Sequence, residues 1–525
     1  MGRPGNPGRP GESQTQMSAY KTRIATLLAG VGAAAWLALP CPVLAADDLQ
    51  EQLPEMGTAA QAALSLEDEY SIGRMVMRNL RASGMVVEDP EIGEYLQSLG
   101  LRLSSLAHDG NGNRQFSFFM VGSREINAFA LPGGFIGVNS GLLLETANES
   151  ELAGVLAHEV SHVTQRHIAR SVEAQSRASL VSAAAMLAAI LIGVAGGSSD
   201  ATMGAIAAAQ GMAAQAQINF TRENESEADR IGIGVLAAAG FDPNAMPAFF
   251  ETMFRRTQLG PDQVPAMLRS HPVTSDRVAE SKDRALQYPP VTVHDSISYA
   301  LIKERARVLS TPPGTSPREY YASMKIDDPD VTVGQIYGKG LAELLSSNAD
   351  AAVRIFEKLL AAHPEVLQFH TALGQAQMSA GNTRAALETL ERARELAPRN
   401  IPVTVRYGEA LLQAGRPKKA HEVLLDLFNN VAPTPEQIRL TALAANAAGD
   451  VADAYSYMAE YHIMGGDLPL AINQLELALS VPSISEVQRQ RYVARLKELR
   501  EAMPKSRRGG SGGKPDSDDG QRPNG

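Results

Sequence analysis

The spacing of apolar residues predicts a first half of mixed structure. Apolar positions at helical intervals indicate amphipathic helices over 66–80 and 90–106. Asn148, with Glu151 three positions later, is typical of the first residues of another helix. Helical patterns therefore stand at the beginning and the end of this region.

Between these helices the pattern changes to short apolar runs. The run at 115–122 predicts a strand. Two further apolar segments within 126–143 are interrupted at Pro132-Gly133-Gly134, which indicates a hairpin. We therefore expect a domain of the α+β class.

A repeat of 34 residues characterises the chain beyond Asp330. Four kinds of position recur at this interval: Gly340, Gly374 and Gly408; Ala352, Ala386 and Ala420; Phe356, Leu390 and Leu424; Pro364 and Pro398. This is the tetratricopeptide period, with small residues where paired helices cross. Ala454 continues the repeat by one step. The pattern returns after only half a period at Ala471, Leu475 and Ala478, so we expect the last helices to be shifted in register or to share a partner helix. We predict an all-α tetratricopeptide solenoid.

Charge and composition limit the partners. The formal net charge of −10 and the lack of sustained basic runs argue against nucleic acid. Basic residues precede an apolar run at 24–39, and small residues around Ala45 offer a cleavage site. We expect an export signal, with an uncleaved anchor as the alternative. Translation starts at Met1 or Met17, because the stretch between them is polar and rich in Gly and Pro. The only cysteine, Cys41, lies inside this signal, so we expect no disulfide.

Histidines and a glutamate at helical spacing supply the candidate chemistry. In "VLAHEVSHVTQRHIAR" (155–170), His158 and His162 are four positions apart and share a helix face, with Glu159 beside them. His167 comes nine positions after His158, which at about 100° per residue turns it to the opposite side. Only two of these histidines can then reach one ion, and a third ligand must come from elsewhere.

Two imidazoles on one helix face suit zinc. A zinc ion held by two imidazoles and one carboxylate keeps a fourth position for water, whose pKa the metal lowers. Glu159, next to the first ligand, is placed to take the proton of that water before it attacks a peptide carbonyl. Taken alone, the motif also fits two surface histidines and a solvated glutamate.

A second helix offers the missing carboxylate. Within 219–236, Glu225 and Asp229 are four positions apart and share a face, whereas Glu227 turns well away from them. One acid of this pair would bind the metal while the other holds a ligand histidine, and spacing leaves open which does which. For Glu223 and Glu227 we expect a solvated acidic face.

These motifs together resemble the HtpX/BepA-type zinc metallopeptidases (gluzincins), which have mitochondrial Oma-type relatives. The resemblance rests on the helix with His158-Glu159-x-x-His162, the helix with Glu225-x-x-Ala228-Asp229 and the strand "NAFALPGG". It spans about 67–277, and the repeat half is similar to the periplasmic BepA branch. It implies that Glu225 is the third zinc ligand and that Asp229 holds a ligand histidine.

The resemblance also assigns a His-Pro motif to His271-Pro272, with Arg277 nearby. Pro272 biases His271 away from helical geometry, so a loop would bring its imidazole to the open zinc position. There it would act as a latch, or it would donate a hydrogen bond to the reacting oxyanion; a loop histidine without contacts is the third option. We favour the latch.

A mode of substrate binding is implied as well. A peptide would add to an exposed edge strand beside the metal, and the candidate residues are Asn127, Phe129, Gly133 and Gly134. For Phe129, ordinary strand packing is an equally good explanation. The apolar stretch 179–214 is interpreted as a buried or membrane-touching helical hairpin near the site, with a transmembrane hairpin as the alternative.

The predicted fold is an α+β zincin-like catalytic domain followed by the solenoid. The expected divisions are an extension with signal peptide (1–46), a zinc metallopeptidase domain (47–287), a linker or loosely packed segment (288–330), the tetratricopeptide domain (331–503) and a disordered tail (504–525).

The expected function is that of a periplasmic endopeptidase with one zinc ion per chain. By the resemblance, it would act in quality control and assembly of outer-membrane proteins, whose unfolded forms and assembly machinery would bind the solenoid. The alternatives are a chaperone-like tetratricopeptide scaffold with a latent protease site and a membrane-integrated protease.

Overall fold

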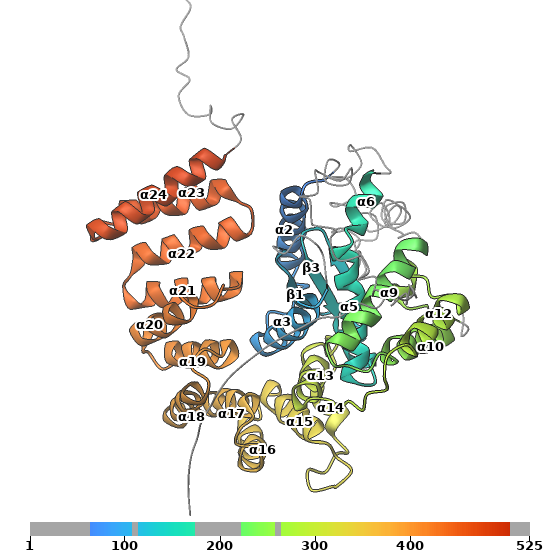
Figure 1. Ribbon diagram of the computed structural model, residues 1–525. Helices are drawn as coiled ribbons and strands as arrows, with labels where there is room; N and C mark the ends of the chain where they lie inside the picture. Colours follow the sequence, from blue (N-terminus) through green and yellow to red (C-terminus); the bar gives the residue numbers. More distant parts are fainter. Residues whose placement is uncertain (1–63, 108–113, 174–221, 258–263, 504–525) are drawn as a thin grey trace, which may run out of the picture. The chain divides into compact units, whose positions relative to one another are not determined.

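The computed structural model describes residues 64–107, 114–173, 222–257 and 264–503 (Figure 1). The expected signal peptide, the apolar stretch 179–214 and the tail beyond 503 lie outside the described residues. Within the described ranges, no helix has both the length and the apolar character needed to cross a membrane.

The first half contains a three-stranded sheet, as predicted. The strands β1 (Ser117–Val121), β2 (Ala128–Leu131) and β3 (Phe135–Asn139) lie in the order β1-β3-β2. Strand β3 is parallel to β1 and antiparallel to β2. The predicted hairpin joins β2 to β3, and its turn places Gly133 and Gly134 at φ of 81° and 85°, which favours glycine.

Helices surround this sheet and complete the α+β domain. They are α2 (Leu66–Ala82), α3 (Pro90–Ser104), α4 (Ser140–Glu145), α5 (Glu149–Thr164), α6 (His167–Glu173), α9 (Arg222–Ala238), α10 (Ala245–Thr257), α11 (Ala266–Ser270) and α12 (Ser275–Ala285). Helix α5 begins as predicted, because the side chain of Asn148 accepts a hydrogen bond from the Glu151 amide at 2.9 Å.

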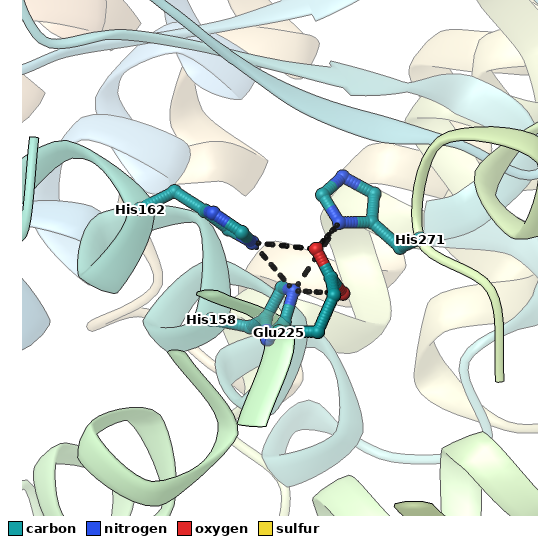
Figure 2. A group of neighbouring side chains, drawn as sticks. All are labelled: His158, His162, Glu225 and His271. Carbon is teal, nitrogen blue, oxygen red and sulfur yellow. Dashed lines mark hydrogen bonds and ion pairs between the residues drawn. The ribbon is translucent and has the colours of Figure 1, made fainter. Parts of the chain in front are cut away.

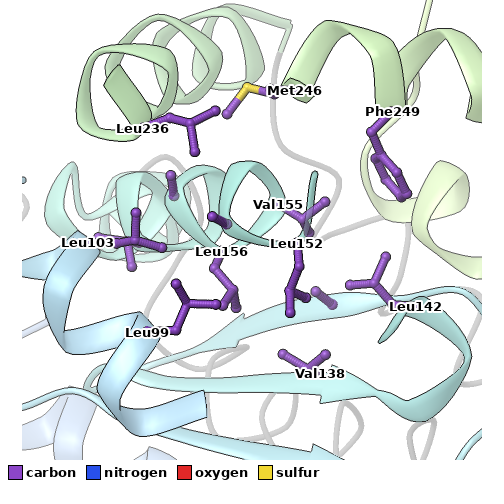
Figure 3. Close-up of a cluster of buried hydrophobic side chains, with 14 of the residues drawn as sticks. Leu99, Leu103, Val138, Leu142, Leu152, Val155, Leu156, Leu236, Met246 and Phe249 are labelled. Carbon is purple, nitrogen blue, oxygen red and sulfur yellow. The ribbon is translucent and has the colours of Figure 1, made fainter. Parts of the chain in front are cut away.

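Helix α5 is the centre of the domain, and all its residues are buried. Figure 3 shows Leu152 and Leu156 directed toward the sheet, where Val138 lies, while Leu236 and Met246 approach α5 from its other side. Because apolar groups cover both faces, the helix has no polar stripe along its length.

Helix α9 packs closely against α5 at Gly232. A Cβ atom at this position would lie 3.2 Å from the backbone nitrogen of His158 and 2.9 Å from the terminal methyl carbon of Met246. The absence of a side chain at Gly232 therefore allows the two helices to approach beside a candidate metal ligand.

The second half is helical throughout its described length. Its helices are α15 (Val333–Leu345), α16 (Ala349–Ala362), α17 (Leu367–Ser379), α18 (Thr383–Leu396), α19 (Ile401–Gln413), α20 (Pro417–Phe428), α21 (Pro435–Ala448), α22 (Val451–Met464), α23 (Leu468–Ser480) and α24 (Glu486–Ala502). The 34-residue register is visible in the packing, because each repeat glycine faces a large apolar residue of the next helix. Measured from an added Cβ, the pairs are Gly340–Phe356 (2.6 Å), Gly374–Leu390 (2.5 Å) and Gly408–Leu424 (2.9 Å).

The segment 288–330 differs from the loosely packed linker that we expected. It contains α13 (Ile297–Leu309) and α14 (Pro317–Tyr321). Helix α13 is buried on two sides: Tyr299 and Ile302 join the core of the first half, while Leu301 and Val308 join the first core of the solenoid. A helix buried on two sides lacks a single apolar stripe, so its periodicity was weak in the sequence.

A buried charge cluster also involves α13. Arg305 lies 2.7 Å from a carboxylate oxygen of Asp89 and 3.0 Å from one of Glu91, at the start of α3. Arg406 of α19 lies 2.7 Å from Glu91. Burial alone would raise the pKa of Asp89, but Arg305 and Arg406 outweigh it and lower the pKa to about 2. Asp89 is therefore ionised at neutral pH and holds both arginines.

Candidate metal centre

Four buried side chains from three parts of the chain converge in the first half. They are His158 and His162 from α5, Glu225 from α9 and His271 from the loop after α11 (Figure 2). Each offers one ligand atom, and these four atoms lie within 4.8 Å of one another.

The separations between these atoms suit a tetrahedral ion. Nε2 of His158 lies 3.0 Å from Nε2 of His162 and 3.5 Å from Oε2 of Glu225. Nδ1 of His271 lies 3.0 Å from Oε1 of Glu225 and 3.4 Å from Nε2 of His158. Ligands about 2.1 Å from a tetrahedral zinc ion would be about 3.4 Å apart. Three nitrogens and one carboxylate oxygen are also ligands that zinc prefers, so the cluster fits this metal.

Local structure explains how these side chains meet. One helical turn separates His158 from His162, as the spacing predicted, and Gly232 brings α9 close enough for Glu225 to reach both histidines. His271 ends α11, where its amide donates to the Met267 carbonyl at 2.7 Å. Pro272 follows it, so the backbone leaves the helix and the imidazole reaches the cluster.

Asp229 and Arg277 support the cluster from behind. Oδ1 of Asp229 lies 2.8 Å from Nδ1 of His158. Arg277 reaches both acids of α9, with Nε 2.6 Å from Oδ2 of Asp229 and Nη1 2.7 Å from Oε2 of Glu225. A planar guanidinium can bind two carboxylates in this way, which an ammonium group cannot reproduce.

The electrostatic effects follow from these contacts. Burial lowers the pKa of His158, but hydrogen bonds to Asp229 and Glu225 outweigh it and raise the pKa to about 9 without metal. Burial and the neighbouring His158 hold the pKa of His162 well below its usual value. Burial would raise the pKa of Glu225, yet His271, His158 and Arg277 hold it well below normal. Glu225 is thus an anion, as a metal ligand must be.

Glu159 lies beside the cluster in a different environment. Its side chain is fully buried, and neither carboxylate oxygen has a hydrogen-bond partner in the described part of the chain. The titratable side chain that lies beside it is His271, whose Nε2 is 3.6 Å from Oε1 of Glu159. A buried carboxylate without hydrogen bonds is costly, and such a group is typically kept for chemistry.

The prediction that His167 points away from the other histidines is wrong. It assumed one continuous helix, but α5 ends at Thr164 and Arg166 adopts a left-handed conformation with φ of 55°. This turn brings Nδ1 of His167 to 2.8 Å from Nδ1 of His162. Glu227 is likewise not a purely solvated acid, because its Oε2 lies 3.1 Å from Nε2 of His167.

The predicted substrate strand lies at the edge of the sheet. Strand β2 pairs with β3 and with no other described strand, and it contacts α5. The ring of Phe129 would lie 2.4 Å from a Cβ placed on Gly137, so this side chain packs on the sheet. Gly133 and Gly134 serve the hairpin turn, and the Asn127 carbonyl accepts from the Asn139 amide at 3.0 Å.

The fold and this site together define a metallopeptidase followed by a helical repeat domain. Residues 91–285 match the model of peptidase family M48, and residues 343–399 and 378–444 match the tetratricopeptide repeat.

Comparison with curated proteins gives a narrower assignment. The chain is 40% identical over 334 residues to the putative beta-barrel assembly-enhancing protease of Vibrio cholerae, covering 63% of this chain and 67% of that protein. It is 36% identical over 351 residues to the beta-barrel assembly-enhancing protease of Escherichia coli K12, covering 66% and 69%. The mitochondrial metalloendopeptidase OMA1 of Schizosaccharomyces pombe is 32% identical over 179 residues, covering 34% and 49%.

The chain therefore belongs to peptidase family M48, in the group of the beta-barrel assembly-enhancing proteases. The predicted resemblance, the two-part fold class and zinc as the cofactor are confirmed.

Proposed function

We propose that the protein is an exported periplasmic endopeptidase that acts in quality control and assembly of outer-membrane β-barrel proteins. The single observation that carries its chemistry is the convergence of His158, His162 and Glu225 beside the buried carboxylate of Glu159, which has no hydrogen-bond partner among the described residues. The proposed biological role draws on the names of the bacterial relatives, which are proteases that enhance β-barrel assembly.

Each residue of the site has a proposed role. His158, His162 and Glu225 hold the zinc ion, which when bound polarises the scissile carbonyl and acidifies water. Glu159 takes the proton from the attacking water and passes it to the leaving amine. Asp229 orients His158, and Arg277 orients both Asp229 and Glu225.

His271 is proposed as a latch. Its Nδ1 lies at the fourth corner of the cluster, where a ligand would exclude water. Its Nε2 faces Glu159 at 3.6 Å, so the latched state also occupies the neighbourhood of the base. The same position favours, as a second candidate function, a chaperone-like scaffold whose protease site is latent.

Substrate binding is proposed at the backbone of β2, between Asn127 and Gly134. Backbone hydrogen bonds to an added strand would accept many sequences, as quality control requires. The side chain of Phe129 is used in sheet packing, so we leave it out of this role. The solenoid would select outer-membrane proteins and their assembly machinery as partners.

The replacement Glu159→Gln tests the proposed chemistry. The variant keeps the shape of the side chain but cannot take a proton, so we expect near-stoichiometric zinc together with a loss of casein digestion of at least about 100-fold. Zinc content by metal analysis and the rate of casein cleavage are the measurements. A variant that cleaves at the parental rate would show that Glu159 is not the base.

A further inference from the structure

His162 differs from His158 in how its outer nitrogen is held. Nδ1 of His158 lies against the carboxylate of Asp229 at 2.8 Å. Nδ1 of His162 instead lies 2.8 Å from Nδ1 of His167, whose Nε2 lies 3.1 Å from Oε2 of Glu227. We propose that His167 and Glu227 form a positioning pair that holds His162 in the orientation and tautomer needed to bind zinc.

One arrangement of protons satisfies all three groups. Two nitrogens 2.8 Å apart share one proton, so one imidazole donates and the other accepts. When Nδ1 of His162 donates, its Nε2 is unprotonated and directs a lone pair at the cluster. His167 then accepts at Nδ1 and donates from Nε2 to the Glu227 carboxylate. The reverse arrangement would leave Nδ1 of His162 unprotonated and place its proton on Nε2, where zinc must bind.

The burial of these groups makes the arrangement specific. His167 is completely buried, whereas the Glu227 side chain is 28% exposed. Arg170 lies 2.7 Å from the same Glu227 oxygen. Glu227 thus stands at the end of the chain of contacts that begins at His162, where its carboxylate can accept a hydrogen bond from Nε2 of His167.

Helix α9 would therefore serve the centre with three acids at alternate positions. Glu225 points at the metal position, Asp229 supports His158 directly, and Glu227 supports His162 through His167. The left-handed residue Arg166 makes this possible, because it returns His167 toward α5. This inference rests on the ligand set proposed above.

Zinc affinity of the purified full chain, measured by competition with a chelator of known affinity, tests the proposal. His167→Phe keeps an aromatic ring without the acceptor, and Glu227→Ala removes the terminal acceptor from a partly exposed position. We expect each to weaken zinc binding by about 10–100-fold. The double variant should bind about as weakly as either single variant, because the two residues act as one unit.

Matched controls separate positioning from general stability. Glu227→Gln retains an oxygen acceptor and should recover most of the affinity. Arg170→Ala removes only the exposed partner of Glu227, and Glu223→Ala changes an exposed acid on the same helix. Both should stay within about twofold of the parent. The absorption spectrum of the cobalt-substituted protein should change in His167→Phe and not in these two controls.

Three results distinguish the possibilities. Unchanged zinc affinity in His167→Phe and Glu227→Ala would overturn the positioning pair, even if metal-free unfolding occurs at lower temperature. An Arg170→Ala loss equal to that of Glu227→Ala would overturn it as well, since Glu227 would then act through the surface ion pair. If His162→Ala binds zinc as tightly as the parent, the proposed ligand set itself fails.

Discussion

At the scale of single residues, His271 is the side chain that we propose as the latch of the centre. A histidine at the fourth corner of a zinc site closes the position that catalysis needs for water. The contacts of His271 with Glu225, His158 and Glu159 come from a side chain on a loop rather than on a long helix. Such a side chain can leave by a local change of backbone conformation.

We therefore predict that His271→Ala raises basal proteolysis. Removal of the imidazole opens the fourth corner to water, so casein cleavage and self-cleavage should both increase by about tenfold or more, consistent with release of a competing ligand. Rates of casein cleavage and gel analysis of the stored protein are the measurements, with Ser270→Ala as the neighbouring control. A decrease of about 100-fold would instead assign His271 to the oxyanion.

Residue spacing in the sequence predicted part of this site. His158, His162 and the pair Glu225 and Asp229 follow from helical periodicity, because residues four apart share a face. The contact of His167 with His162 could not be predicted, because it depends on a left-handed backbone conformation at Arg166. Residues other than glycine rarely adopt this conformation. When α5 is assumed to continue past Thr164, His167 is misplaced and its contact with Glu227 is missed.

At the scale of elements, the contact between α5 and α9 sets the geometry of the centre. The two helices approach closely at Gly232, one turn beyond Ala228 and opposite the backbone of His158. A side chain here would push apart the helix with the histidines and the helix with the acids.

Gly232→Ala should therefore weaken both the fold and the metal site. Overpacking against His158 and Met246 costs about 1–3 kcal/mol, which exceeds the gain of up to about 1 kcal/mol from replacing a helical glycine. We expect a lower unfolding temperature and weaker zinc binding. Both are measured by thermal unfolding with and without added zinc.

Gly234→Ala on the same helix is the matched control. Among the described residues, an added Cβ there approaches only the Tyr288 hydroxyl, at 3.1 Å, so we expect the helix to gain stability or stay unchanged. Equal losses in the two variants would show that the close helix contact at Gly232 has no special importance.

Elements with one buried face were predictable, whereas of the elements buried on two faces α5 was predicted through its capping residues and histidine spacing and α13 was missed. The hairpin, α2 and α3 followed from simple periodicity and turn residues, and the 34-residue repeat followed from its own recurrence. Helix α13 did not, because residues such as Tyr299 and Leu301 face different cores. A helix that packs on two sides lacks the single apolar stripe from which an amphipathic helix is predicted.

At the scale of the whole molecule, α13 connects the two halves by packing. The solenoid covers Leu301 and Val308, and Arg305 binds both Asp89, which caps the start of α3, and the hydroxyl of Tyr337 in α15. A domain boundary near Asp330 therefore separates α13 from part of its own core.

A fragment that ends at Asp330 should fold poorly compared with one that ends at Ala380. The shorter fragment exposes Leu301, Val308 and Tyr321, each worth about 1.5–3 kcal/mol of burial, whereas the longer one keeps α15 to α17 over them. We expect the shorter fragment to unfold at a temperature lower by about 10 °C or more. Thermal unfolding followed by circular dichroism is the measurement.

Both fragments lack Arg406, so they differ in the apolar cover on α13 and in the Tyr337 hydroxyl that binds Arg305, but not in the ion pairs of Arg406. Equal unfolding temperatures would mean that α13 is stable without the solenoid, as the expected division at 330 assumed.

The central position of α5 has an evolutionary consequence. His158 is surrounded by Asp229, Glu225 and Arg277, none of which has access to much water. Replacement of His158 alone by an apolar residue would leave buried charges without their partner, which lowers the free energy of unfolding by several kcal/mol. Descendants that abandon peptide hydrolysis are therefore expected to exchange the histidines of α5, the acids of α9 and Arg277 together. A distant relative in which all of these residues are replaced together is expected to be a stable protein without peptidase activity, such as a scaffold. A relative in which only one of them is replaced is expected to be unstable.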